Sequence, residues 1–448
     1  MKLSVSILTA VGMLAALPAV ARAQDQVWLS DRRYTEGIGY RVGDFELHPG
    51  LAGEFGYDSN YLHRADSEDP VGALRLRITP SFSISTLGKQ RRDAAPGVEP
   101  PVAEFRAGVS ATYNEFFDVS GPDIDAGELR GLSAALDISA LILPQRPWSF
   151  AFTGNLNRDI APSNSGLGDN DFDRVHARVG GEVIWTPGAG LFDWRAGYNF
   201  SGTFFESDAF GGLTNLQHEI TTRGRWRFLP RTALMFDGRQ GFISYTDPDP
   251  DGKTSSHPLR ARIGINGLVT NSFGLLALAG YGASFYTPRP QEDFDSIIGQ
   301  AEVKWYITAN PTANPMAATL SLSSVALGFN RDFADAYFGT YESRNRGYLN
   351  TSYFFANRFL LVVEGGVAAV QYPASDELGA DPGTDVRIDG SVFGEFRFAD
   401  SLGLNGTVRY NANLSDNVIV VTNSDGTTAQ DSLDYQQFEA YIGFRWFM

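Results

Sequence analysis

The last twelve residues of the chain, QFEAYIGFRWFM at positions 437–448, alternate strictly between two kinds of side chain. One face carries only apolar side chains, from Phe438, Ala440, Ile442, Phe444, Trp446 and Met448. The other face carries Gln437, Glu439, Tyr441, Gly443, Arg445 and Phe447. Period-two alternation is typical of a β-strand. A transmembrane barrel turns the apolar face to lipid and the polar face to its lumen, so this stretch predicts a barrel strand.

The same alternation recurs upstream, most clearly over 217–228, 297–305 and 385–398. In each stretch the charged residues fall on one face only, as the wall of a barrel requires. A soluble β-sandwich also alternates, but it buries its apolar face in a core. The stretch 273–286 departs from the pattern because it is apolar on both faces.

The connections between these strands are of two kinds, which take turns along most of the chain. Short turns are expected at 144–147, 187–190, 229–230, 271–272, 356–357 and 399–400. Long polar loops are expected at 158–171, 206–215, 246–258, 332–340, 373–384 and 415–433. Two longer, Pro-containing connections, 88–101 and 309–315, fall on the short-turn side. A barrel with short periplasmic turns and long extracellular loops has this arrangement.

Counting strands between these connections gives about eighteen, an even number typical of bacterial single-chain barrels. The expected cores are 45–57, 71–87, 102–117, 129–143, 148–157, 173–185, 191–205, 216–228, 231–245, 259–270, 273–286, 294–308, 317–331, 341–355, 358–372, 385–398, 401–413 and 434–448. Aromatic residues crowd the strand ends, where a girdle at headgroup level is expected. The predicted fold is therefore all-β, a single transmembrane antiparallel β-barrel.

The first 23 residues resemble a secretory signal peptide. Lys2 provides the positive charge, an apolar run follows over 3–20, and Ala21-Arg22-Ala23 forms a cleavage site before Gln24. Loss of Lys2 and Arg22 takes the formal net charge from −16 to −18. Three segments are expected: a signal peptide over 1–23, a short periplasmic N-terminal segment over 24–44, and an outer-membrane barrel over 45–448.

Composition excludes several other classes of protein. The chain has no Cys, so neither a disulfide-stapled scaffold nor a lipoprotein is expected. After Ala23 no apolar run is long enough to cross a bilayer as a helix. The strong negative charge argues against a nucleic-acid partner. The outer membrane of a Gram-negative bacterium is the predicted location.

Two short motifs carry a family resemblance. The segment FELHPGL at 45–51, followed by GYDSN at 56–60, resembles the opening of the family known as beta-barrel porin 2. The closing FRWFM at 444–448 resembles the aromatic C-terminal signal read by the barrel-assembly machinery, although it ends on Met448 rather than Phe. The assembly signal would comprise Phe438, Ile442, Phe444, Trp446 and Met448. Some members of this family accompany exopolysaccharide export, and the resemblance therefore implies periplasmic polysaccharide-export components as partners.

Strand parity predicts which charged residues line the pore. They are Arg223, Arg225, Arg227, Arg260, Arg262, Glu302, Arg387, Glu395, Arg397, Glu439 and Arg445. The three arginines over 223–227, with two more on the next-but-one strand, would form an anion-attracting wall. The alternative is a network of internal ion pairs that holds the wall or fills the lumen.

Metal and catalytic motifs are weak. TDPDPDG at 246–252 resembles the start of a calcium loop, but Pro258 stands where an EF-hand needs Glu, so a solvated acidic loop is expected. Divalent ions bridging such a loop to lipopolysaccharide remain an alternative. His63 lies beside two acidic residues but in no nucleophile motif, and we expect neither enzymatic activity nor a cofactor.

The sequence therefore predicts an aqueous conduit through the outer membrane. The most specific form of this prediction is a conduit that exports a polysaccharide. The alternatives are a diffusion porin for small polar solutes or a non-conducting structural or adhesive barrel. The segment 24–43 is too short for the plug of an active-uptake receptor. Expected partners are outer-membrane lipid, lipopolysaccharide and the barrel-assembly machinery.

Overall fold

The computed structural model describes residues 39–65, 67, 69–86, 102–120, 126–127, 129–144, 146–160, 173–206, 208–246, 253–287, 293–307, 323–336, 339–355, 358–374, 382–399, 401–422 and 428–448. The predicted signal peptide, residues 24–38, the acidic motif at 247–252 and Asp400 lie outside these ranges, as do the connections 88–101 and 309–315. Across the described ranges, no helix has the length and apolar character needed to cross a membrane.

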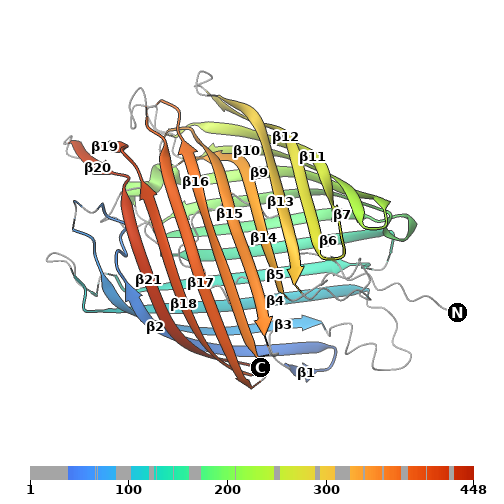
Figure 1. Cartoon of the computed structure of the whole chain (residues 1–448), viewed down its shortest axis with the longest axis horizontal. Coiled ribbons are helices and arrows are strands. Elements are labelled where there is room, and N and C mark those ends of the chain that lie inside the picture. Colours follow the sequence, from blue (N-terminus) through green and yellow to red (C-terminus); the bar gives the residue numbers. More distant parts are fainter. Residues whose placement is uncertain are drawn as a thin grey trace.

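Eighteen antiparallel strands close into one barrel over these residues (Figure 1). They are β2 (Phe45–Asp58), β3 (Ala73–Thr86), β4 (Ala103–Phe117), β5 (Gly131–Ile142), β6 (Trp148–Asp159), β7 (Arg174–Trp185), β8 (Phe192–Phe205), β9 (Asn215–Leu229), β10 (Thr232–Tyr245), β11 (Ser255–Leu268), β12 (Phe273–Thr287), β13 (Phe294–Ile307), β14 (Ser323–Asp335), β15 (Tyr341–Phe355), β16 (Phe359–Gln371), β17 (Asp385–Ala399), β18 (Leu402–Leu414) and β21 (Tyr435–Phe447). Each pairs with the next along this list. The last strand, β21, closes the ring on β2, from Gly50↔Phe447 to Asp58↔Glu439.

The predicted barrel and its strand number are confirmed, with two corrections. β1 (Tyr40–Val42) lies in the predicted separate N-terminal segment but pairs with β2, because Gly43, at a φ of +63°, permits a two-residue turn. The long connection predicted over 415–433 contains a hairpin of β19 (Val418–Thr422) and β20 (Thr428–Ser432). The β-branched run VIVVT favours a strand there, although it lacks the alternation of a membrane strand.

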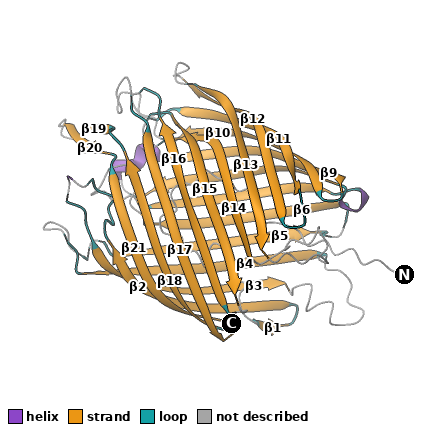
Figure 2. Ribbon diagram, viewed as in Figure 1, coloured by secondary structure: helices purple, strands orange, loops and turns teal. Residues whose placement is uncertain are grey.

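Two short 3-10 helices with described bounds lie between the strands, coloured purple in Figure 2. Gly188–Gly190 lies in the short turn between β7 and β8, and Asp208–Leu213 lies in the long connection between β8 and β9. Because consecutive strands are antiparallel, the strand ends next to the long connections lie at one end of the barrel, and the strand ends next to the short turns lie at the other, as the sequence predicts.

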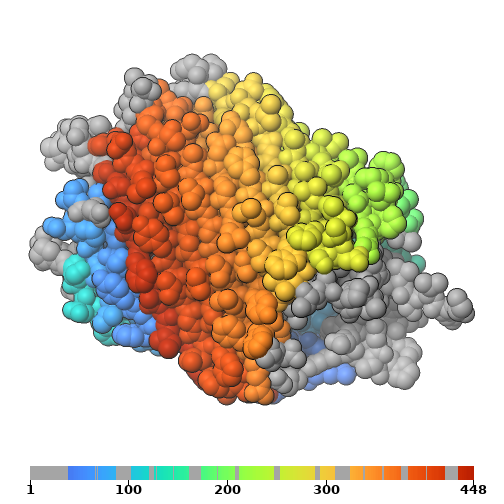
Figure 3. Space-filling model, in the orientation of Figure 1, coloured from blue at the N-terminus to red at the C-terminus, as the bar shows by residue number. Residues whose placement is uncertain are grey.

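The two faces of the barrel differ as the alternation predicts. In β21, Ile442 and Phe444 point outward with 60% and 48% of their surface exposed, whereas Glu439 and Arg445 point inward with 2% and 3% exposed. The outward side chains of β13–β18 and β21 form a continuous outer wall (Figure 3). An exposed apolar wall on a closed barrel is the surface that lipid would cover.

The strand that is apolar on both faces, β12, now has a structural explanation. Its inward Gly282 leaves the space that Phe333 and Ile298 fill, since an added Cβ would lie 2.7 Å and 2.8 Å from their side chains. These two residues are 2% and 1% exposed and pack with Phe294 inside the barrel. The inner face of β12 thus packs against an apolar cluster on the lumen side.

Candidate transport lumen

The lumen wall beside the closing seam is dense with buried ion pairs. Glu54 on β2 lies 3.1 Å from Arg77 on the paired strand β3, and both side chains are at most 3% exposed. Closer to the long-loop end of the same two strands, Asp58 on β2 lies 3.8 Å from Arg75 on β3. The Arg77 guanidinium also lies 3.7 Å from the ring centroid of Tyr441 on β21. These contacts join the first two strands of the barrel to its last.

A second group of ion pairs lies near the short-turn end. The fully buried carboxylate of Glu395 accepts hydrogen bonds from Arg445 Nε at 2.6 Å and from Arg397 Nε at 2.9 Å. Both guanidinium groups lie over the ring of Phe447, at 4.6 Å and 5.6 Å. Arg445 and Glu395 come from β21 and β17, so the pair spans the intervening strand β18.

Three of the five arginines predicted to form an anion-attracting wall have carboxylate partners. Arg223 donates to both carboxylate oxygens of Glu182, at 2.7 Å and 2.9 Å. The other two pairs are Arg262 with Asp237, at 3.0 Å, and Arg260 with Asp332, at 2.9 Å. Strand register explains the Asp237 contact, because Asp237 lies opposite both Arg223 and Arg262 in the sheet.

Arg225 and Arg227 differ from these three. Both point inward at the short-turn end of β9, and no described carboxylate lies within salt-bridge distance of either. Asp193 lies opposite Arg225 in the register, but it accepts from Arg195 at 3.2 Å. The positive charge of the predicted wall is therefore concentrated on this pair at one mouth of the lumen.

The remaining residues of the predicted lining also have polar partners on the inner face. Glu439 lies 3.5 Å from Arg409, Glu302 accepts a hydrogen bond from the Tyr348 hydroxyl at 2.8 Å, and Arg387 lies 3.2 Å from Glu342. The partners Glu182, Asp237 and Asp332 were not singled out from the sequence. Alternation along each strand indicates that these three side chains point inward. The register between neighbouring strands, which brings each of them to a particular arginine, cannot be derived from the sequence.

Part of the first long connection folds into the mouth of the barrel at the long-loop end. Tyr61 is 5% exposed, packs on Phe116 with ring centroids 4.6 Å apart, and donates to the Ile160 carbonyl oxygen. His63 is 2% exposed, stacks on Tyr435 and lies 3.0 Å from the Gln437 amide oxygen. This connection therefore narrows the mouth beside the seam, and the environment of His63 is that of a packed structural residue.

Other inward charges, on two separate stretches of the wall, are exposed to solvent. The inward side chains of Arg223 on β9 and Asp389 on β17 are 41% and 44% exposed, although each takes part in an ion pair. Glu364 on β16 points inward, is exposed and accepts a hydrogen bond from Asn350. Charged groups at these positions would meet water inside the barrel.

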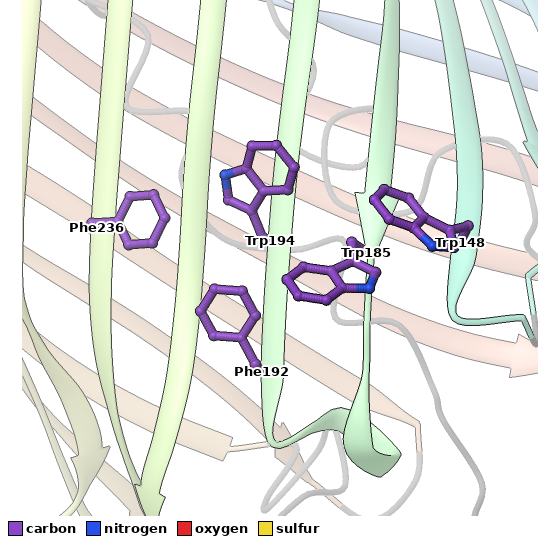
Figure 4. Close-up of a pocket in the computed structure, with 5 residues that line it drawn as sticks. All are labelled: Trp148, Trp185, Phe192, Trp194 and Phe236. Atoms are coloured by element: carbon purple, nitrogen blue, oxygen red, sulfur yellow. The ribbon is translucent and has the colours of Figure 1, made fainter.

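Two apolar pockets lie on the outer face of the barrel. One, of about 350 Å³, lies at the short-turn end and is lined by Trp148, Trp185, Phe192, Trp194 and Phe236 (Figure 4). Figure 4 shows the three Trp rings on the neighbouring strands β6, β7 and β8, with Phe236 across a gap on β10. The ring of Phe236 lies over Gly224 of β9, where a Cβ would approach it to 2.1 Å. The cavity belongs to the aromatic girdle that the sequence predicts.

The predicted assembly signal lies on this same outer face. Phe438, Ile442, Phe444 and Trp446 point outward with 36–60% of their surface exposed. Met448 ends the chain beside β2, where its backbone N–H donates to the Pro49 carbonyl oxygen and its own carbonyl oxygen lies 3.0 Å from His48 Nδ1. No group of three or more metal-ligating side chains occurs in the described part of the chain.

Comparisons with known proteins place the chain in no family. No family model matches it, and no curated protein matches it. Among solved structures, it is similar to the BenF-like porin from Pseudomonas fluorescens Pf-5, with a TM-score of 0.46 and 10% identity over 91% of this chain and 100% of that one. It is also similar to the outer membrane protein opdK from Pseudomonas aeruginosa, with a TM-score of 0.44 and 10% identity over 90% and 99% of the two chains. The FrpB iron transporter from Neisseria meningitidis gives 0.44 and 7% over 93% and 83%. Likenesses this distant carry no argument about function, which has to come from the lumen itself.

Proposed function

We propose that this chain is an outer-membrane porin whose lumen is a passive aqueous conduit for small polar solutes. The solvent-exposed inward charges of Arg223 and Asp389 carry the proposal, because a barrel filled by its own side chains would bury them. The exposed apolar outer wall and the aromatic girdle support the membrane location.

The size of the ring is compatible with a water-filled channel. Eighteen strands spaced ~4.8 Å apart and tilted by ~40° enclose a backbone cylinder about 35 Å across. Inward side chains and the mouth residues Tyr61 and His63 reduce this width on the seam side. A solute would pass the exposed inward charges on β9 and on β16 and β17.

The charge of the lining favours anions at the short-turn mouth. Glu182, Asp237 and Asp332 neutralise three arginines, whereas Arg225 and Arg227 have no carboxylate within salt-bridge distance in the described structure. Asp193 lies opposite Arg225 and attracts Arg227, but it pairs with Arg195. Two cations without a salt-bridge partner, two residues apart on one strand, would raise the local concentration of small anions. We therefore expect weak anion preference, strongest for carboxylates and phosphates that the planar guanidinium groups bind in pairs of hydrogen bonds.

Planar-bilayer recordings test both statements. The purified protein should conduct, and the reversal potential in a salt gradient should indicate anion preference. The double variant R225Q/R227Q should move the reversal potential toward cation preference. The matched control E182Q/R223Q removes one positive and one negative charge from the same wall and should leave the reversal potential unchanged. A protein that is electrically silent, with or without residues 24–43, would refute the conduit and leave a structural or adhesive barrel.

Export of a polysaccharide is the second candidate, supported by the resemblance of FELHPGL at 45–51 and of GYDSN at 56–60 to the beta-barrel porin 2 family. It requires the same open lumen but a longer substrate, and periplasmic export proteins would be its partners. Deletion of the gene distinguishes the two candidates. Polysaccharide trapped in the cell envelope would favour export, whereas normal secretion from cells whose purified protein conducts would favour the diffusion porin.

A further inference from the structure

Two of the five histidines of the chain lie on the outer face of the barrel, in one row that crosses five neighbouring strands. The row consists of Phe200, His218, Phe242, His257 and Phe285, on β8 to β12, and we call it the histidine row. Phe200 lies opposite His218, His218 opposite Phe242, and His257 opposite Phe285 in the sheet register. Phe242 and His257 form an edge-to-face contact with ring centroids 5.3 Å apart.

Both imidazoles are exposed, and Phe rings of the row lie next to them. In the same row, Phe242 is 38% and Phe285 is 48% exposed. The other three histidines point inward or lie against the seam, and each has a partner within the protein: Met448 for His48, Gln437 for His63 and Thr203 for His176. A polar ring facing the membrane needs a different explanation from these three.

The height of the row in the membrane follows from strand geometry. His218 lies near the long-loop end of β9, and Phe228 lies in the girdle at the other end of the same strand. Their separation of ten residues corresponds to about 25 Å along the membrane normal at ~3.3 Å per residue and ~40° tilt, which is the height of the apolar band. The histidine row therefore lies at headgroup level on the long-loop side, the outer leaflet in an outer membrane.

The hydrogen bonding of His218 in the described structure uses one of its two ring nitrogens. The Tyr198 hydroxyl lies 2.6 Å from Nδ1 of His218. When this hydroxyl donates to Nδ1, the ring proton is on Nε2, which becomes an N–H donor even when the imidazole is neutral. His257 offers the same chemistry two strands away, about 10 Å along the sheet.

From this geometry we propose that the histidine row binds the phosphate groups of lipid A in the outer leaflet. Imidazole N–H groups donate to phosphate oxygens, and an imidazolium pairs with the phosphate charge. The Phe rings on either side offer faces for the sugar and the first acyl carbons. The inference rests on the proposed outer-membrane location but not on conduction.

Two carboxylates lie near this surface, both on the β13 side. Asp293 accepts a hydrogen bond from the backbone N–H of Tyr286, the residue after Phe285. Asp295 on β13 points outward and is exposed, and Tyr281 donates a hydrogen bond to its carboxylate. It lies opposite Ala283, one row closer to the membrane centre than the histidine row and two strands from His257. Its repulsion of a phosphate therefore acts from the edge of the site, so the headgroup should be centred on β9 to β11.

Lipid titration of the purified protein in detergent micelles tests the proposal. Native mass spectrometry would count bound lipid A and, separately, lipid A from which both phosphates have been removed. We expect the parent protein to bind the phosphorylated form about tenfold more tightly, and H218F/H257F to lose most of that preference. The substitutions keep an aromatic row, so the barrel should still fold. The control W226F removes an outward indole at the opposite rim and should behave like the parent.

Equal affinity of the parent for both lipids, or an unchanged preference in H218F/H257F, would overturn the proposal. A change in the number of subunits in H218F/H257F would also overturn it, because it would show that a second copy of the chain covers the row. Conductance of the same preparations separates this site from the porin function. H218F/H257F should conduct like the parent because the row faces away from the lumen. A silent parent that still prefers phosphorylated lipid A would refute the conduit and support the site.

Discussion

The pair of Glu54 and Arg77 offers the sharpest test of how the barrel is closed. The two side chains are directly opposite on β2 and β3, 3.1 Å apart and 2–3% exposed. Replacing Arg77 by Met keeps the apolar contact with Tyr441 but leaves the Glu54 carboxylate buried without its partner. Removal of one partner from a buried pair costs about 3–5 kcal/mol, so R77M should lower the free energy of unfolding by about that amount.

The double variant E54L/R77M should recover most of this loss. Two nitrogens of Arg77, Nε and Nη1, have no hydrogen-bond partner in the described structure, so the native pair is itself incompletely satisfied. Replacing such a pair by apolar residues of similar volume is often neutral or stabilising. The coupling between the two positions in a double-mutant cycle should therefore exceed about 2 kcal/mol.

Urea titration in detergent micelles, followed by tryptophan fluorescence and by the gel mobility of unheated samples, measures these changes. Glu115 and Arg130 provide the control, since this pair lies on the outer face and its arginine is 53% exposed. R130M should cost far less than R77M, because water screens an exposed ion pair. Equal losses of unfolding free energy for R77M and R130M, or no recovery in E54L/R77M, would contradict the reasoning. Either result would show that water hydrates the charges at the seam.

Substitution along the outer face should depend on depth: I442R, near the middle of β21, should destabilise the barrel by about 2–4 kcal/mol in lipid vesicles, and W226R, in the girdle, by about 1 kcal/mol or less. Equal costs would contradict the assigned membrane position. At the long-loop rim, the hydrogen bond from Arg158 holds the pKa of Glu206 below its ordinary value of 4.5, so the stability from this contact is present above that value and is lost as pH falls through the lower folded pKa. The amide protection factors around Arg158 and Glu206, corrected for the intrinsic exchange rate, should therefore fall at low pH in the parent and change less in E206Q, and identical pH profiles would refute the linkage. Because the chain lacks Cys, D416C on the long-connection side should react with an impermeant reagent on intact cells and R358C on the short-turn side should not; the reverse result would invert the topology.

The alternation of side chains determined the fold of this protein. Residues 437–448 and the strands that repeat their pattern require one apolar and one polar face, and only a closed barrel provides a lipid side and a wet side for so many strands. The predicted strand 341–355 has the same bounds as β15, and the predicted start of 385–398 coincides with that of β17. Parity also predicts that the arginines of β9 share one face, because the side chains of a strand alternate whatever their neighbours are.

Tertiary structure decided which of these charges remain available. A strand's own sequence does not contain its register against the next strand, and a shift of one residue would change every cross-strand partner. Only the closed sheet brings Asp237 between Arg223 and Arg262, while Arg225 and Arg227 are left without a described carboxylate partner. For the same reason the histidine row was invisible in the sequence, where its members are up to 85 positions apart. Neighbouring strands align them because the register of each hairpin sets the height of its residues in the membrane.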